Sequence, residues 1–128
     1  MKTVEVVAGV LKFENKYLCV QRGASNYDYI HHKFEFPGGK IESGESQKDA
    51  LVRELNEELK ITLSRVDKKI TTVDHQYPDF RLIMHVYLCE LNSSEITLSE
   101  HIDFRWLERH EMDSLDWAAA DLPILKLI

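Results

Sequence analysis

The segment from Ser46 to Leu59 constrains the fold more than any other part of the chain. It contains neither Gly nor Pro, and it places Leu51, Leu55 and Leu59 four residues apart, a spacing that brings side chains to one face of an α-helix. Ser46 suits the position before the first turn, where its hydroxyl can accept a hydrogen bond from a free backbone N–H. We therefore expect a helix over 46–59 whose apolar face packs on another layer.

The other apolar segments are short and rich in β-branched and aromatic residues, as strands are. We expect strands at Val4–Leu11, Tyr17–Val20, Phe34–Phe36, Ile70–Asp74, Arg81–Cys89 and Phe104–Leu107, and a helical segment at Glu108–Leu115. The long polar and aromatic segment Gly23–His32 is a candidate functional loop. Because strands and helices mix without strict alternation, we expect the α/β (α+β) class, with a mixed β-sheet flanked by helices.

Length and composition limit the classes of protein to consider. A chain of 128 residues is expected to form one domain, residues 1–128. Its 22 acidic residues against 16 Lys and Arg give a net charge of -6, which argues against duplex nucleic acid as a partner, since phosphate contacts need clustered cations. No apolar run is long enough for a bilayer and no secretory signal is visible, so we expect a cytoplasmic protein with no membrane partner. Cys19 and Cys89 are then expected as reduced core thiols rather than a disulfide.

Three carboxylates lie together on the expected helix. Glu57 and Glu58 follow Glu54 by three and four residues, so all three share one side, next to the leucine face rather than opposite it. Like charges at this spacing repel one another, and a solvated acidic face is the simplest explanation. The glycine-rich segment Gly38-Gly39 leads into the helix, however, and a carboxylate cluster beside exposed backbone suits a hard cation such as Mg²⁺. We favour the metal site.

The same residues carry a resemblance to a known family. Gly39, Glu45 and the run Arg53–Ile61, which reads Arg-Glu-Leu-Asn-Glu-Glu-Leu-Lys-Ile, resemble the Nudix box over residues 39–61. In that signature five variable residues separate a Gly from a Glu, and seven more separate this Glu from the run Arg-Glu-hydrophobic-any-Glu-Glu-any-Gly-hydrophobic. The chain departs from it at Lys60, where the family has a Gly that ends the helix in a left-handed conformation.

The resemblance covers nearly the whole chain and is similar to the MutT branch of the family. It includes Phe36-Pro37-Gly38-Gly39-Lys40 before the box, and Trp106 and the segment 119–123 after it. It implies the Nudix α/β/α sandwich around a mixed sheet. It also implies a hydrolase of phosphoric anhydride bonds, which splits a nucleoside triphosphate into monophosphate and pyrophosphate.

The resemblance also assigns roles to individual residues. It implies Mg²⁺ as cofactor, with Mn²⁺ as a substitute, held by the Gly38 carbonyl and by the catalytic carboxylates of Glu54, Glu57, Glu58 and Glu100. Either Glu54 or Glu57 would accept the proton of the attacking water. Glu100 is chosen by its spacing to Trp106, and the alternatives are Glu95, Asp103 and Glu108. Glu45 and Arg53 resemble the ion pair that orients the glycine loop against the helix.

Four further residues are candidate substrate contacts. Arg22 resembles a phosphate-contacting Arg, Lys40 could offset phosphate charge, and Phe36 could stack on a base; the alternatives are two solvated cations and a core ring. Asp121 aligns with the residue that reads the base edge in the MutT branch, and the alternative is a cap of the last short helix. The six histidines show no zinc-ligand spacing and are expected at the surface or partly buried.

The sequence thus predicts a monomeric, Mg²⁺-dependent nucleoside triphosphate pyrophosphatase. Its expected substrates are oxidised guanine nucleotides such as 8-oxo-dGTP, which would make it a pool-sanitising enzyme that protects DNA. The alternatives are hydrolysis of CTP or modified pyrimidine triphosphates, hydrolysis of nucleoside diphosphate derivatives, and a non-catalytic Nudix domain that only binds nucleotide.

Overall fold

The computed structural model describes residues 1–63 and 65–128. Within these residues seven strands form one mixed sheet in the order β3-β2-β1-β6-β5, with β4 paired to β1 and β7 paired to β2. β1 and β6 run parallel, and the other pairs are antiparallel. The strands are β1 Lys2–Phe13, β2 Lys16–Gln21, β3 Phe34–Glu35, β4 Gly38–Lys40, β5 Lys68–Gln76, β6 Phe80–Glu90 and β7 Asp103–Leu107. The helices are α1 Gln47–Leu59 and α2 Leu122–Leu125, with 3₁₀ helices η1 Arg109–Ser114 and η2 Ala119–Asp121.

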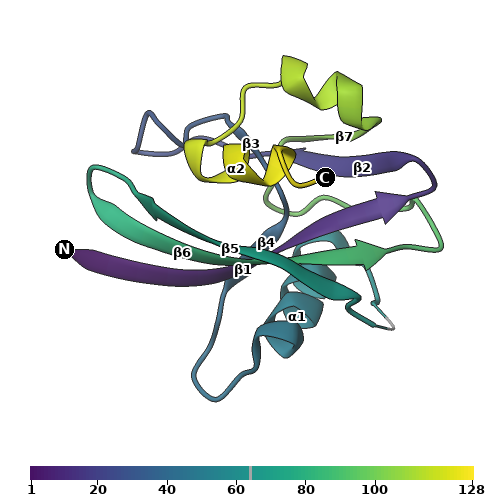
Figure 1. Cartoon of the computed structure of the whole chain (residues 1–128), viewed down its shortest axis with the longest axis horizontal. Coiled ribbons are helices and arrows are strands. Elements are labelled where there is room, and N and C mark those ends of the chain that lie inside the picture. The colour runs from purple at the N-terminus through teal and green to yellow at the C-terminus, as the bar shows by residue number, and fades with distance from the viewer. Residues whose placement is uncertain (64) are drawn as a thin grey trace.

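The sheet lies between two layers, with α1 on one face and α2 on the other (Figure 1). On the first face, four fully buried side chains of α1 pack against the sheet: Ala50, Leu51, Leu55 and Leu59. On the second face, a separate apolar cluster joins the sheet to Trp117 and Ile124. The α/β/α sandwich expected from the sequence is therefore confirmed.

β1 contributes to both apolar clusters, because successive side chains of a strand point to opposite faces of the sheet. Val7 and Leu11 pack with α1, whereas Ala8 and Val10 pack with the cluster on the other face. A strand covered on both faces is expected to be apolar, as the buried segment 7–11 of β1 is. β1 is also the strand against which β4 pairs, so the buried centre of the sheet holds the glycine segment in place.

Helix α1 begins and ends as its sequence predicts. The Ser46 hydroxyl accepts a hydrogen bond from the backbone N–H of Asp49 at 3.1 Å. At the other end Lys60 has φ 57° and ψ 31°, which is the left-handed conformation that favours glycine. The Lys60 backbone N–H donates to the carbonyl of Asn56 at 3.1 Å, so the helix closes normally despite the missing Gly.

We expect Lys60→Gly to stabilise the protein by about 0.5–1 kcal/mol, because Gly adopts a positive φ without the steric penalty of a Cβ. The gain is partly offset by loss of the hydrogen bond that the Lys60 ammonium donates to the Glu57 carbonyl. Thermal unfolding followed by circular dichroism measures the change in stability. The same change at Lys48, which lies inside α1, should lower stability. If the melting temperature of Lys60→Gly is equal to or lower than that of the wild type, the backbone of Lys60 is not strained by its positive φ.

One local expectation was wrong. The strand expected at 34–36 ends at Glu35, and Gly38–Lys40 forms the separate strand β4, because pairing with β1 decides the structure where two glycines offer no side-chain pattern. The segment expected to be helical at Glu108–Leu115 is indeed helical, as a 3₁₀ helix over Arg109–Ser114. The alternative given for Asp121, a cap of the last short helix, is not observed: Asp121 precedes α2, but its side chain makes no capping hydrogen bond. None of the helices in the described part of the chain is long and apolar enough to cross a membrane.

Candidate active site

Two glycines allow the loop before α1 to approach its neighbours closely. A Cβ at Gly38 would lie 1.9 Å from the backbone oxygen of Val7, and a Cβ at Gly39 would lie 2.3 Å from the carboxyl carbon of Glu54. Neither position therefore accepts a side chain without displacement of β1 or of Glu54. The glycines let β4 pair at the centre of the sheet and let the Glu54 carboxylate lie directly against it.

Arg53 is the centre of an ion-pair network that joins this loop to α1. Its Nε and Nη2 donate to both carboxylate oxygens of Glu45, at 2.6 and 2.9 Å. Nη2 also donates to the Lys40 carbonyl at 3.0 Å, and Nη1 donates to Glu54 at 2.9 Å and Glu57 at 3.2 Å. The two parallel bonds to Glu45 fix the guanidinium plane, so this one side chain sets the positions of the loop backbone and of two box carboxylates.

The pKa values of Glu45 and Arg53 agree with this geometry. The hydrogen bonds from Arg53, together with the backbone N–H of Glu42, hold the pKa of Glu45 at about 2. The same bonds to Glu45 raise the pKa of Arg53. Both groups therefore stay charged over the whole range in which an enzyme works, and the orienting pair predicted from the sequence is present as an ion pair.

Glu58 is the box carboxylate with the least compensation. Its Oε2 is buried and has no hydrogen-bond partner among the described residues. Burial, helped by the negative charges of Glu54, Glu35 and Glu100, raises the pKa of Glu58 to about 8. A buried carboxylate oxygen without a partner, surrounded by other carboxylates, suits a cation that would supply the missing positive charge. The residues present therefore fit a divalent metal ion.

Glu100 is brought to the same place by the segment before β7. The hydroxyl of Ser99 donates to the Glu58 carbonyl at 2.9 Å, which attaches this segment to the end of α1. Glu100 itself is exposed, and its charge contributes to the raised pKa of Glu58. The structure thus places Glu100 in the same cleft as the box carboxylates, and its role as a metal ligand stays a prediction.

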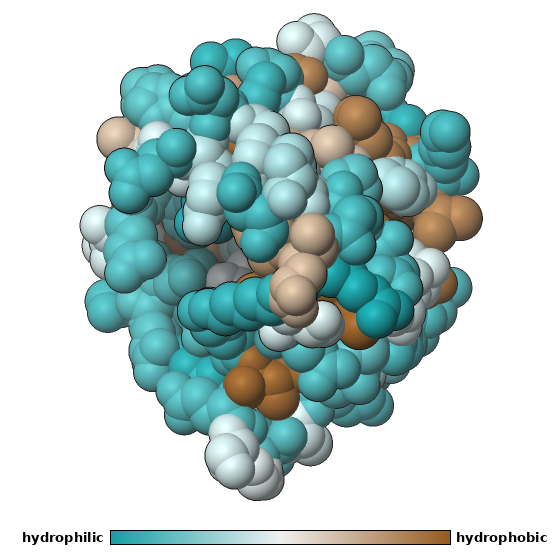
Figure 2. All heavy atoms as spheres, turned by 90° about the vertical axis from the view of Figure 1, so that its left-hand side faces the viewer, coloured by the Kyte–Doolittle hydropathy of each residue, from teal (hydrophilic) through white to brown (hydrophobic). Residues whose placement is uncertain are grey.

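A cleft of about 1070 Å³ brings most of the predicted site residues together. Its lining includes Arg22, Phe36, Gly38, Lys40, Glu54, Glu57, Glu58, Glu100 and Asp121. Glu45 and Arg53 are not part of the lining and act on it through their neighbours. Figure 2 looks onto the end of the molecule where the loop 23–32 and the turn between β5 and β6 lie, and it shows a mainly hydrophilic surface hollowed near its centre.

Asp121 and Phe36 form the inner wall of the cleft. Asp121 is 4% exposed, and its Oδ2 accepts a hydrogen bond from the Phe36 backbone N–H at 2.8 Å. Burial, with the charge of Glu35 adding to it, raises the pKa of Asp121 well above its usual range. The Phe36 ring is 3% exposed and stacks on Trp117 with centroids 4.8 Å apart, so it is packed as a core ring and offers a base little surface.

The two predicted cations also line the cleft. Arg22 is about half exposed, and its Nη1 lies 3.4 Å from the carboxylate of Glu35. Lys40 is exposed, and its backbone carbonyl accepts the bond from Arg53 described above. Both side chains are placed where phosphate oxygens could reach them, and their role stays a prediction.

Sequence reasoning missed several residues that line the cleft. His101, which was expected with the other histidines at the surface or partly buried, has a side chain only 6% exposed and lies 3.0 Å from Glu35. An aromatic group also forms part of the wall: Tyr77 packs against Phe80 at 5.2 Å, and Phe80 packs against Tyr27 of the long loop at 5.8 Å. The clustering of aromatic residues around the turn at Pro78 was the only available signal.

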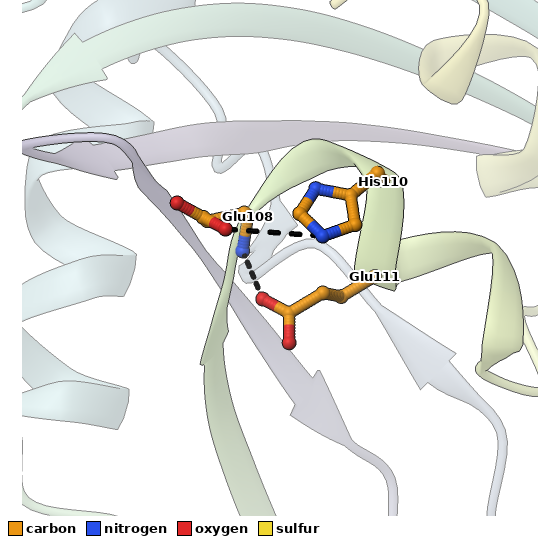
Figure 3. A group of neighbouring side chains, drawn as sticks. All are labelled: Glu108, His110 and Glu111. Carbon is orange, nitrogen blue, oxygen red and sulfur yellow. Dashed lines mark hydrogen bonds and ion pairs between the residues drawn. The ribbon is translucent and has the colours of Figure 1, made fainter.

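A second group of ligand-type side chains lies outside the cleft. In the described ranges, the ligand atoms of Glu108, His110 and Glu111 all come within 4.8 Å of one another (Figure 3). Glu108 and Glu111 form a capping box at the start of η1, with the Glu108 N–H donating to the Glu111 carboxylate at 2.9 Å. The arrangement is explained by helix capping on an exposed surface.

Comparisons with known proteins identify the family of this chain. The model of the NUDIX domain matches residues 1–128. The chain is 30% identical to the 8-oxo-dGTP diphosphatase of Escherichia coli K12, over 98% of this chain and 95% of that protein. It is 36% identical to the CTP pyrophosphohydrolase of the same strain, over 98% and 91%. The solution structure of MutT, a Nudix hydrolase from methicillin-resistant Staphylococcus aureus 252, is 40% identical over 98% and 95%, with a TM-score of 0.73.

The chain therefore belongs to the NUDIX domain family, and it is a hydrolase of that family. Nudix hydrolases depend on divalent metal ions, which agrees with the uncompensated carboxylate of Glu58 in the cleft.

Proposed function

We propose that this protein hydrolyses nucleoside triphosphates to monophosphate and pyrophosphate with Mg²⁺, and that oxidised guanine nucleotides such as 8-oxo-dGTP are its substrates. The observation that carries the proposal is the buried, unpartnered Oε2 of Glu58 among further carboxylates, in a cleft large enough for a nucleotide. The relative named 8-oxo-dGTP diphosphatase supports the choice of base. We include in the proposal that residues 1–128 act as one domain, with residues 39–61 as its metal-binding part, and as a cytoplasmic monomer.

The roles proposed for the carboxylates follow from charge. The carboxylates of this cleft would repel a polyphosphate unless cations lie between the carboxylates and the phosphates. The Gly38 carbonyl and the carboxylates of Glu54, Glu57, Glu58 and Glu100 would hold the metal. When bound, Mg²⁺ supplies charge neutralisation of the phosphates and activation of water. Mn²⁺ would serve as a substitute, since it too takes oxygen ligands.

The remaining residues orient the reactants. Arg53, fixed by Glu45, holds Glu54 and Glu57 in place, and one of these two carboxylates accepts the proton of the attacking water. Arg22 and Lys40 lie where they can contact phosphate oxygens, so that the leaving pyrophosphate stays aligned with the attacking water. Phe36 closes the inner wall of the cleft, and Asp121 reads the edge of the base.

A second candidate is a pyrophosphatase for CTP. The CTP pyrophosphohydrolase is 36% identical to this chain, and an ionised Asp121 would accept a hydrogen bond from the cytosine amino group. A pyrophosphate-release screen over ordinary and oxidised nucleotides, with Mg²⁺ and with chelator, separates the candidates. Faster turnover of 8-oxo-dGTP than of dGTP and CTP supports the first, and faster turnover of CTP supports the second. Release in chelator at the rate seen with Mg²⁺ would exclude both.

We expect Asp121→Asn to remove a pH dependence from base selection. The raised pKa of Asp121 means that its carboxyl donates a hydrogen bond at lower pH and only accepts at higher pH, whereas Asn does not ionise. The ratio of kcat/KM for CTP to that for 8-oxo-dGTP should change with pH in the wild type and stay constant in the variant. Titration of the metal ligands affects the kcat/KM of both substrates equally, so it does not change their ratio.

The same variant should be more stable than the wild type at neutral pH. Because the folded-state pKa of Asp121 lies above the unfolded value of about 4, its ionisation opposes folding, and this cost appears as the pH rises through that range. The stability difference should therefore shrink in acid. Asp116→Asn, at a carboxylate 73% exposed, is the matched control and should change neither quantity. Identical pH dependence of the ratio in wild type and Asp121→Asn would place base reading elsewhere.

A further inference from the structure

His101 is a buried histidine whose surroundings are not explained by packing alone. Its side chain is 6% exposed and lines the cleft, and its Nε2 lies 3.0 Å from Oε2 of Glu35. Since a carboxylate accepts, Nε2 carries the hydrogen. Its Nδ1 is buried and has no partner among the described residues. An apolar side chain would fill this space without burying an unpaired nitrogen, so the imidazole contributes something that packing does not require.

The bond to Glu35 is one of two attachments that flank Glu100. On one side the Ser99 hydroxyl donates to the Glu58 carbonyl at 2.9 Å, which ties the segment to α1. On the other side His101 ties it to Glu35 on β3. Glu100 is exposed and lies between these attachments, so the direction of its carboxylate depends on both.

Glu35 extends the connection across the cleft. Its Oε1 accepts from Arg22 at 3.4 Å while its Oε2 accepts from His101. Arg22, Glu35 and His101 therefore form a continuous chain of hydrogen bonds from the end of β2 to the residue next to Glu100. One carboxylate thus holds both the candidate phosphate contact and the segment that carries the additional metal carboxylate.

We propose that His101 is a positioning residue that, through its hydrogen bond to Glu35, holds Glu100 beside the box carboxylates for metal binding. The proposal rests on the proposed metal-binding role of Glu100. Groups that orient a metal ligand typically affect metal affinity or activity by about 10- to 100-fold when removed. An effect of that size is expected here without loss of the fold, because His101 lies on a loop at the cleft and its Nδ1 has no bond to lose.

The test compares His101→Leu, His101→Gln, Glu35→Ala and Glu100→Gln, each alone, and the double variant His101→Leu/Glu100→Gln. Titration calorimetry with MgCl₂ and MnCl₂ in the absence of nucleotide measures metal affinity, and thermal melting reports the fold. Values of kcat and KM for 8-oxo-dGTP and CTP follow. His101→Leu should weaken Mg²⁺ binding and lower kcat by about 10- to 100-fold with little change in melting temperature. His101→Gln should recover most of the loss, since its amide nitrogen can donate to Glu35.

The double variant distinguishes positioning from a general structural effect. If His101 acts through Glu100, adding His101→Leu to Glu100→Gln should cause no further loss of metal affinity. Losses that add in full, or equal losses in His101→Leu and His101→Gln, would overturn the proposal. If His101→Leu fails to fold, His101→Gln and Glu35→Ala decide by the same criteria, with Glu35→Ala expected to match the loss predicted for His101→Leu. A wild type that binds Mg²⁺ but releases no pyrophosphate would overturn the proposed function, while the titrations would still decide the role of His101.

Discussion

Glu58→Gln is expected to lower turnover by about three orders of magnitude or more and, in metal-free buffer, to raise stability above that of the wild type at pH 8. The loss follows because an amide keeps the shape of the carboxylate but not the charge that holds a cation, and removal of one essential catalytic group has effects of this size. Glu57→Gln should also nearly abolish turnover. Steady-state kinetics with Mg²⁺ and calorimetric metal titration measure both changes.

The opposite sign for stability follows from the buried position of Glu58. Its pKa of about 8 in the folded protein lies above the unfolded value, so ionisation opposes folding between about pH 4 and pH 8, and Gln removes this cost. The melting temperature of Glu58→Gln should exceed that of the wild type increasingly over this range. Glu95→Gln, at an exposed acid that does not line the cleft, is the control for both measurements. Wild-type turnover in either box variant would exclude the catalytic assignment.

Arg53→Ala is expected to lower turnover by about a hundredfold, although Arg53 does not line the cleft. The guanidinium fixes Glu45, the Lys40 carbonyl, Glu54 and Glu57 at once, and small displacements of catalytic groups have effects of this size. Glu45→Gln should act in the same direction and more weakly, because its amide oxygen still accepts one of the two bonds. Kinetics and circular dichroism separate displaced groups from unfolding.

The hairpin formed by β5 and β6 offers a matched control for Arg53. Arg81 makes a comparable two-bond pair with Asp74, at 2.8 and 2.5 Å, but both side chains are about half exposed. Exposed pairs contribute about 0–1 kcal/mol, so Arg81→Ala should leave turnover unchanged and alter stability little. If Arg53→Ala and Arg81→Ala behave alike, the network around Arg53 has no orienting role.

The parts of the protein predicted most accurately are those whose signals are local. Helix α1 was placed from the leucine spacing and from Ser46, and the structure starts it one residue after that cap. The side-by-side placement of Glu54, Glu57 and Glu58 follows from helix geometry alone. The departure at Lys60 could also be interpreted. The helix end requires a residue in the left-handed conformation, and Lys60 adopts it although a Gly would do so with less strain.

The parts that sequence reasoning missed depend on contacts between distant segments. For Asp121 the sequence left a helix cap as the alternative to base reading, but its carboxylate is bonded to the Phe36 N–H, a partner that no local pattern indicates. His101 gave no signal either, since its burial depends on Glu35 of β3 lying across from it. Strand β4 consists largely of glycines, which carry no hydropathy pattern, and it exists because β1 lies beside it.

The parallel pairing of β1 with β6 has a consequence for how the protein is made. Lys2 lies opposite Phe80 and Lys12 opposite Glu90, so the centre of the sheet joins one segment of the chain with another that is synthesised much later. Such distant pairing makes folding slow, because a long loop must close before the contacts form. At usual synthesis rates the apolar β1 waits for roughly 5–15 s without its partner. The nascent chain, rather than the finished enzyme, is therefore the form most exposed to aggregation.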